Sequence, residues 1–255
     1  MEQERNMLDT AIAAARRAGK LLLDASRGEI RVDARTRRDV KLEMDRKADE
    51  AIVKTILAAH PDHAVLTEER GKLGKESEWL WVIDPLDGTY NYSRRIPVWC
   101  ASIGLLRHGQ EHLGVIYDPV AGDLYSAQRG RGAAVNDRPA AVSEIARLED
   151  AAICFSSSPA DDDLARTMAA AERLATSAAK VRGMGAAASH LAYVAAGRAD
   201  AFYDFGAKLW DVAAGIALIR EAGGAVTTRP RDDVTLDICV SNGRFHEDLL
   251  REIGW

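Results

Sequence analysis

Five short β-rich stretches in the first half of the chain place the strongest limit on how it folds. They span residues 64–66, 80–83, 98–106, 113–117 and 124–128. Turn residues, such as the His-Gly-Gln segment at 108–110, separate them. Apolar and β-branched runs joined by short turns pair with their neighbours in the chain, so this pattern predicts an antiparallel sheet.

Two amphipathic helices are predicted ahead of this sheet. Apolar residues recur at helical spacing over residues 8–25 and again over 45–60, where Pro61 ends the pattern. Asp45 lies at or near the start of the second helix. The arginines of the polar stretch between the two helices are Arg35, Arg37 and Arg38. They are predicted either to contact an anionic substrate or to lie on a solvated strand face.

The second half of the chain alternates between strand-like and helix-like segments. The expected strands cover residues 151–155, 180–182, 201–203 and 238–240, and the expected helices cover residues 162–176, 187–196 and 210–222. Such alternation is typical of helices layered on a sheet. Because no flexible linker separates the two patterns, we expect two tightly joined units, residues 1–145 and 146–255, with a site across their interface.

The composition excludes several classes of protein. The 255 residues include 47% apolar and 29% charged residues, and the formal net charge is -5. A net acidic chain lacks the basic surface by which proteins usually bind nucleic acid, so nucleic acid is not an expected partner. No secretory signal or membrane span is visible, which favours a soluble cytoplasmic protein. The three cysteines lack the spacing of a zinc or redox site and are expected to be buried thiols.

Residues 81–89, Trp-Val-Ile-Asp-Pro-Leu-Asp-Gly-Thr, carry the clearest chemical signal. An apolar strand runs directly into two carboxylates, Asp84 and Asp87, that are three residues apart across a turn. Both carboxylates and the carbonyl of Leu86 are placed to converge on a hard cation, which prefers oxygen ligands. The alternative is a plain turn, in which aspartate, proline and glycine supply only the geometry.

Further carboxylates follow other predicted elements. Glu68 and Glu69 end a short apolar run, and Asp211 begins an alanine-rich helix. Singly, Asp211 is explained by the favourable position of a carboxylate at a helix N-terminus, and Glu68 by a solvated loop. Together with Asp84 and Asp87, they indicate a cluster of acidic metal ligands drawn from three segments.

These motifs resemble the inositol monophosphatase family, within the larger group of Mg²⁺-dependent, lithium-sensitive phosphatases that includes fructose-1,6-bisphosphatases. The resemblance covers most of the chain, and its motifs follow in the order of the family. The matching stretches are Thr-Glu-Glu at 67–69, the Asp-Pro-Leu-Asp-Gly-Thr segment within 81–92, and residues 130–137, 195–203 and 209–224.

The resemblance implies a layered αβαβα sandwich, commonly a homodimer, with two or three Mg²⁺ ions between its halves. The first ion would be held by Glu68, Asp84 and the Leu86 carbonyl, and the second by Asp84, Asp87 and Asp211. A third, weakly held ion would lie near Glu68, with Glu69 as an outer ligand. The implied catalytic residues are Asp45, Thr89 and Glu68, with Thr89 orienting the attacking water and Asp45 hydrogen-bonded to the threonine hydroxyl.

The resemblance also implies which residues contact the substrate. The backbone N–H groups of Gly88 and Thr89 would hold a phosphate oxygen. The residues expected to contact the rest of the substrate are Asp87, Gly185, Ala186, Ala187, Asp204 and Lys208. Leu42 stands where relatives often have a threonine three residues before the aspartate equated with Asp45.

The expected reaction is hydrolysis of a small phosphate monoester, with inositol 1-phosphate or a related sugar or polyol phosphate as first choice. Histidinol phosphate, fructose 1,6-bisphosphate and 3′-phosphoadenosine 5′-phosphate are alternative substrates. A binding protein associated with transcription is an alternative of a different class, because some relatives contact the transcription apparatus.

Overall fold

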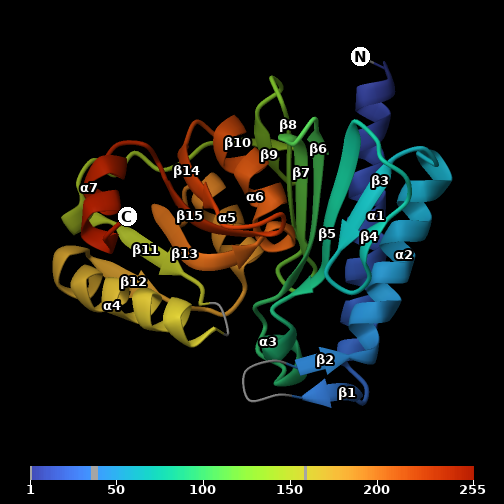
Figure 1. The fold of residues 1–255 in the computed structure, drawn as a ribbon, viewed down its shortest axis with the longest axis horizontal. Coiled ribbons are helices and arrows are strands. Elements are labelled where there is room, and N and C mark those ends of the chain that lie inside the picture. Colours follow the sequence, from blue (N-terminus) through green and yellow to red (C-terminus); the bar gives the residue numbers. More distant parts are fainter. Residues whose placement is uncertain (1, 36–39, 158–159) are drawn as a thin grey trace.

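Five alternating layers of helices and sheets make up the computed structural model, which describes residues 2–35, 40–157 and 160–255 (Figure 1). Helices α1 (Glu2–Ser26) and α2 (Glu43–Ala59) form one outer layer, and α4 (Asp161–Ser177) and α7 (His246–Ile253) form the other. Helices α5 (Ala187–Ala195) and α6 (Leu209–Glu221) lie between the two sheets. The predicted αβαβα sandwich is thereby confirmed.

The larger sheet has eight strands in the order β10-β9-β8-β7-β6-β5-β3-β4. Their bounds are β3 (Ala64–Thr67), β4 (Gly71–Leu73), β5 (Trp79–Asp87), β6 (Cys100–Arg107), β7 (Gln110–Asp118), β8 (Asp123–Gln128), β9 (Ala133–Val135) and β10 (Arg138–Ala140). The prediction of an antiparallel sheet is wrong for one pair, because β3 and β5 are parallel. Strand β4 forms a hairpin with β3 and occupies its outer edge. The chain then crosses to the inner edge of β3, where β5 pairs parallel to β3.

The smaller sheet has five strands in the order β12-β11-β13-β15-β14. Their bounds are β11 (Ala152–Phe155), β12 (Lys180–Arg182), β13 (Ala201–Lys208), β14 (Ala225–Pro230) and β15 (Thr235–Ser241). The strand β11 pairs in parallel with β12 and β13. Parallel neighbours need long crossovers, which α4 and α5 provide.

Three small elements complete the fold. They are the two-stranded sheet of β1 (Val32–Arg35) and β2 (Val40–Leu42), the short helix α3 (Thr89–Ser93), and a 3₁₀ turn at Leu148–Asp150. The large sheet ends before residue 141 and the small sheet begins at Ala152. The division into units 1–145 and 146–255 stays a prediction. Helix α6 of the second segment packs directly on β6 and β7 of the first, so the two segments share one packed interior.

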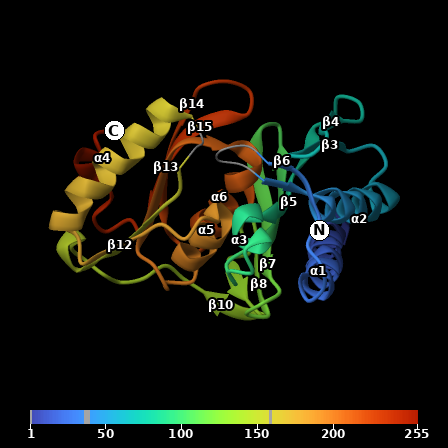
Figure 2. The same cartoon turned by 90° about the horizontal axis from the view of Figure 1, so that it is seen from below.

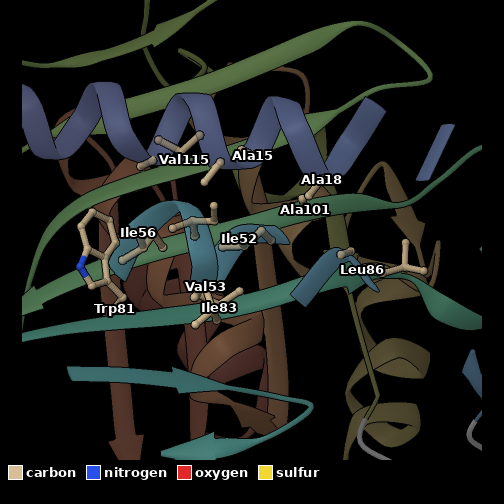
Figure 3. Close-up of a cluster of buried hydrophobic side chains, with 14 of the residues drawn as sticks. Ala15, Ala18, Ile52, Val53, Ile56, Trp81, Ile83, Leu86, Ala101 and Val115 are labelled. Carbon is tan, nitrogen blue, oxygen red and sulfur yellow. The ribbon is translucent and has the colours of Figure 1, made fainter. Parts of the chain in front are cut away.

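Small side chains on α1 let this helix approach the large sheet closely. Ala15 and Ala18 are fully buried, and Figure 3 shows them over the sheet, with Ile52 and Ile56 of α2 pointing into the same cluster. Trp81 of β5 is also fully buried in it. Burial of this apolar cluster anchors β5, and therefore the carboxylates at its end.

The central helix α6 has no solvated face through most of its length. Seven consecutive residues from Val212 to Leu218 are buried, because sheets lie on both sides. Alanine and glycine suit this position, since larger side chains would hold the sheets apart. On the sheet side, a Cβ atom added to Gly114 would collide with the carbonyl of Ala214. Gly114 therefore sets the distance between β7 and α6.

None of the described helices combines the length and the apolar character needed to cross a membrane. Cys100, Cys154 and Cys239 are buried and carry free thiols, as the sequence predicted.

We expect Gly114→Ala to lower the free energy of unfolding by about 1–3 kcal/mol, the usual cost of overpacking a tight core contact. Urea unfolding followed by circular dichroism measures the change. Gly28→Ala is the matched control, because an added Cβ there meets only the Ala25 carbonyl at 3.6 Å. Equal stability of the two variants would contradict the role given to Gly114.

Candidate active site

A cavity of about 380 Å³ opens where the ends of both sheets meet the middle helices. One side is formed by Glu68, which follows β3, and by β5 and α3. The other side is formed by β11 and the residues after it, the 183–187 segment, β13 and the start of α6. Figure 2 shows the layers from below, with α5 and α6 between the two sheets. The predicted site residues that line it are Glu68, Asp84, Leu86, Asp87, Gly88, Thr89, Gly185, Ala187, Asp204, Lys208 and Asp211.

An irregularity in the pairing of β5 brings two carboxylates to this cavity. Asp84 lies opposite Ser102 and Asp87 lies opposite Cys100, so β5 has one more residue than β6 over this interval. In a regular strand, residues three apart point to opposite faces. The extra residue is a β-bulge, which re-aims side chains next to it. Both aspartates therefore line the same cavity.

The Asp87 carboxylate joins the two halves of the chain. It accepts hydrogen bonds from the backbone N–H groups of Ala187, Ala188 and Ser189, at 3.1, 2.8 and 3.4 Å, in the first turn of α5. Burial raises the pKa of Asp87 to about 6, and these N–H groups oppose the rise. The helix N-terminus thus stabilises the carboxylate in its charged form.

Asp84 and Asp211 are held by their own backbone. The Leu86 N–H donates to Asp84 at 2.9 Å, and the Lys208 N–H donates to Asp211 at 3.1 Å in the first turn of α6. Burial is the main cause that raises the pKa of each carboxyl well above its usual value. Repulsion adds to this effect, since the charges of Glu68, Asp87 and Asp211 all act on Asp84.

This donor set fits a hard cation. Glu68, Asp84, Asp87 and Asp211 line one cavity together with Leu86. Carboxylate and carbonyl oxygens are the ligands that Mg²⁺ and Ca²⁺ take. Within residues 2–35, 40–157 and 160–255, no three His, Cys, Asp or Glu side chains already form a metal site. Like charges repel without a cation between them, which accounts for this open arrangement.

The expected hydrogen bond between Asp45 and the Thr89 hydroxyl is not present in this structure. The Thr89 hydroxyl donates instead to the Leu86 carbonyl at 2.9 Å, and Asp45 accepts from the Leu42 N–H at 2.7 Å. The second carboxylate oxygen of Asp45 is buried and lacks a partner among the described residues. Asp45 does not line the cavity. Burial raises the pKa of its carboxyl to about 8, and repulsion from Glu69 and Glu68 adds to the rise.

Ala186 is placed differently from the prediction as well. It lies behind Gly88 and does not line the cavity. Gly88 has a φ of +90°, and an added Cβ would come 2.8 Å from the Val98 carbonyl and 3.2 Å from the Ala186 methyl. Only glycine fits this position, where the chain turns from β5 into α3.

Asp204 and Lys208 stand on the wall formed by β13. One carboxylate oxygen of Asp204 is buried without a hydrogen-bond partner among the described residues, and burial raises its pKa well above the usual value. The Lys208 ammonium donates to the Thr235 hydroxyl at 2.8 Å. Asp204 thus lines the cavity and has an unused acceptor oxygen, whereas the ammonium already has one partner.

Several cavity residues escaped the sequence analysis. Tyr90, Phe155, Ser156, Ser157 and Gly183 also line the cavity. Ser156 and Ser157 follow the predicted strand 151–155, and the position of polar residues at a strand end is the signal that would have found them. Glu69, expected as an outer ligand, forms an ion pair with Lys41 at 3.1 Å. Arg37 and Arg38 lie outside the described residues, as does the side chain of Arg35.

Asn91 ties the two walls together. Its amide nitrogen donates to the carbonyls of Val98 and Met184 at 2.9 and 2.7 Å, and lies 3.4 Å from that of Gly185. The residue is buried, so its bonds are shielded from water.

We expect Asn91→Asp to lower the free energy of unfolding by at least about 1–3 kcal/mol, because it places a carboxylate against carbonyl oxygens and removes their donor. Asn6→Asp, at an exposed position, controls for the added charge. Urea denaturation compares the two variants. An Asn91→Asp protein as stable as the Asn6→Asp protein would contradict the tethering role.

Solved structures share this layered architecture. An inositol monophosphatase from Anabaena is 36% identical, with a TM-score of 0.88 over 98% of this chain and 96% of that chain. The extragenic suppressor protein SuhB from Bartonella henselae is 33% identical, with a TM-score of 0.89 over 96% of this chain and 97% of that one.

Sequence comparisons agree with the structural ones. The family model described as "Inositol monophosphatase family" matches residues 3–253. The chain belongs to the inositol monophosphatase family. An inositol-1-monophosphatase from Mesorhizobium japonicum is 39% identical over 97% of this chain and 96% of its own length. A Nus factor SuhB from Pasteurella multocida is also 39% identical, over 86% of this chain and 84% of its own length.

Proposed function

We propose that this protein is a Mg²⁺-dependent phosphomonoesterase that hydrolyses a small phosphorylated metabolite with an activated water molecule. The observation that carries the proposal is the convergence of Glu68, Asp84, Asp87, Asp211 and the Leu86 carbonyl on one cavity. A phosphate monoester is anionic, so a cavity lined with carboxylates binds it only with cations in between. Membership of the inositol monophosphatase family supports the same reaction class.

The donor set divides naturally into two ion sites. Glu68, Asp84 and the Leu86 carbonyl would hold one Mg²⁺, Asp84, Asp87 and Asp211 would hold a second, and Glu68 would border a third, weaker site. When bound, such ions neutralise phosphoryl oxygens and lower the pKa of water. The Gly88 and Thr89 N–H groups, at the start of α3, would bind a phosphate oxygen.

Thr89 and Asp45 would handle the proton of the attacking water. The Thr89 hydroxyl lies at the cavity and now bonds to the Leu86 carbonyl. A cation held by that carbonyl would weaken its bond to the Thr89 hydroxyl, which would then be free to turn. The unpartnered oxygen of Asp45 is the acceptor that we propose for it.

For the substrate, we propose inositol 1-phosphate or a related polyol phosphate. The unused acceptor of Asp204 suits a hydroxyl on the leaving alcohol. Gly185 and Ala187 would leave room for its ring, since both are small and line the cavity. Lys208 would instead favour a second anionic group, as in fructose 1,6-bisphosphate or 3′-phosphoadenosine 5′-phosphate. Histidinol phosphate is a further alternative within the same reaction class.

A second role in transcription is a separate candidate, favoured by the relatives named Nus factor SuhB. Formation of a homodimer and a cytoplasmic location also belong to the proposal. The proposal of phosphatase activity does not rest on any of these three.

Phosphate release from inositol 1-phosphate is expected to require Mg²⁺, to stop in EDTA, and to be inhibited by Li⁺ and by excess Ca²⁺. Asp84→Asn should lower kcat by at least about 100-fold, because Asp84 is shared by both proposed ion sites. Asp162→Asn, an exposed site on α4, is the charge-matched control. Undiminished turnover in EDTA, or a near-normal kcat for Asp84→Asn, would overturn the assignment.

The proton-handling pair is tested by a double-mutant cycle. Thr89→Ala and Asp45→Asn should each lower kcat about 10²- to 10⁴-fold with little change of KM, the range seen for a positioned proton acceptor. Asparagine keeps an oxygen for the Leu42 N–H, so the start of α2 stays capped. Steady-state kinetics of the double variant should show a loss much smaller than the product of the single losses. If the loss of kcat in the double variant equals the product of the two single losses, Thr89 and Asp45 act independently and the proposed pair is wrong.

A further inference from the structure

The proposed chemistry does not use His190, a buried histidine that links two segments on one side of the cavity. His190, in α5, is fully buried. Its Nδ1 atom lies 3.3 Å from the Ser156 hydroxyl at the end of β11. Its Nε2 atom lies 3.1 Å from the backbone N–H of Met184, next to the cavity residues Gly183 and Gly185.

These two contacts determine where the imidazole carries its proton. A backbone N–H can only donate, so Nε2 must be the unprotonated nitrogen that accepts from Met184. Nδ1 then carries the proton of the neutral ring and donates to Ser156. Burial lowers the pKa of His190 to about 4, so the ring is neutral near pH 7.

The orientation of the Ser156 hydroxyl follows from this tautomer. Its oxygen accepts from His190, so its own proton is not used in that bond. Ser156 lines the cavity and is only partly buried. The serine is therefore set to donate a hydrogen bond to a ligand in the cavity.

We propose that Ser156 is a specificity-determining residue that donates to a hydroxyl oxygen of the leaving alcohol, and that His190 is the positioning residue that holds it in this role. The inference rests on the proposed phosphatase function and narrows its substrate class to polyol phosphates. Asp204, which lines the same cavity, has an unpartnered buried acceptor. A donor and an acceptor in one cavity match neighbouring hydroxyl groups, each of which can accept and donate.

Three variants separate the two bonds of His190. Ser156→Ala removes the donor. His190→Gln keeps an oxygen near the position of Nε2 for the Met184 N–H but loses the bond to serine. His190→Asn keeps an N–H near the position of Nδ1 for Ser156 and loses the bond to Met184. His190→Asn should therefore preserve the role of Ser156, whereas His190→Gln should not. Because both variants lack the imidazole ring, a difference between them cannot arise from loss of the ring alone.

Steady-state kinetics with Mg²⁺ should compare inositol 1-phosphate with p-nitrophenyl phosphate, whose leaving group has no hydroxyl to bind. For inositol 1-phosphate, Ser156→Ala and His190→Gln should each raise KM roughly 3- to 10-fold with kcat unchanged, the loss expected for one neutral hydrogen bond. For p-nitrophenyl phosphate, KM should not change. His190→Asn should retain the wild-type preference between the two substrates.

Nuclear magnetic resonance of ¹⁵N-histidine-labelled protein tests the geometry without turnover. The spectrum should show His190, assigned by its loss in His190→Gln, as the neutral tautomer protonated at Nδ1. A proton on Nε2 would overturn the inference, as would equal KM changes for both substrates or a loss of preference in His190→Asn. If wild-type protein releases phosphate from neither substrate, the proposed function itself fails and the narrower inference with it.

Discussion

The bond between the Asp87 carboxylate and the N-terminus of α5 is the contact on which the site depends. Asp87 ends β5 in the first half of the chain, and the three N–H groups belong to the second half. A buried carboxylate needs such donors, and a helix N-terminus supplies them together with a favourable dipole. The same contact joins the end of β5 to the middle helix α5 at the cavity.

The cavity concentrates more negative charge than its surroundings neutralise. Asp84 and Asp87 are buried and Asp211 is half-buried. The charges of Asp87 and Asp211 raise the pKa of Asp84, and the charge of Asp87 raises that of Asp211. Burial of like charges costs free energy, which the folded core must supply. Cations that bind between these carboxylates would recover this energy, so the same feature that destabilises the free protein would favour ion binding.

The middle layer lets the two sheets share this site. Helix α6 has a buried alanine-rich segment and contacts both sheets, and its first turn presents Asp211 to the cavity. Helix α5 beside it caps Asp87 with its N-terminus and carries His190, which reaches across to β11. These two helices thus position groups on both walls, while α2 of the outer layer carries Asp45.

The sequence by itself determined the layered architecture and the main carboxylates, because these are encoded locally. Helical and strand periodicity is a property of neighbouring residues, and acidic residues directly after apolar strands mark Glu68, Asp84 and Asp87. Only the tertiary structure decided the parallel pairing of β3 with β5, the place of Ala186 behind Gly88, and the partner of Thr89. It also joined Ser156 to His190, 34 residues away. Such contacts depend on which distant segments meet, and on competition between hydrogen-bond partners, which no local pattern records.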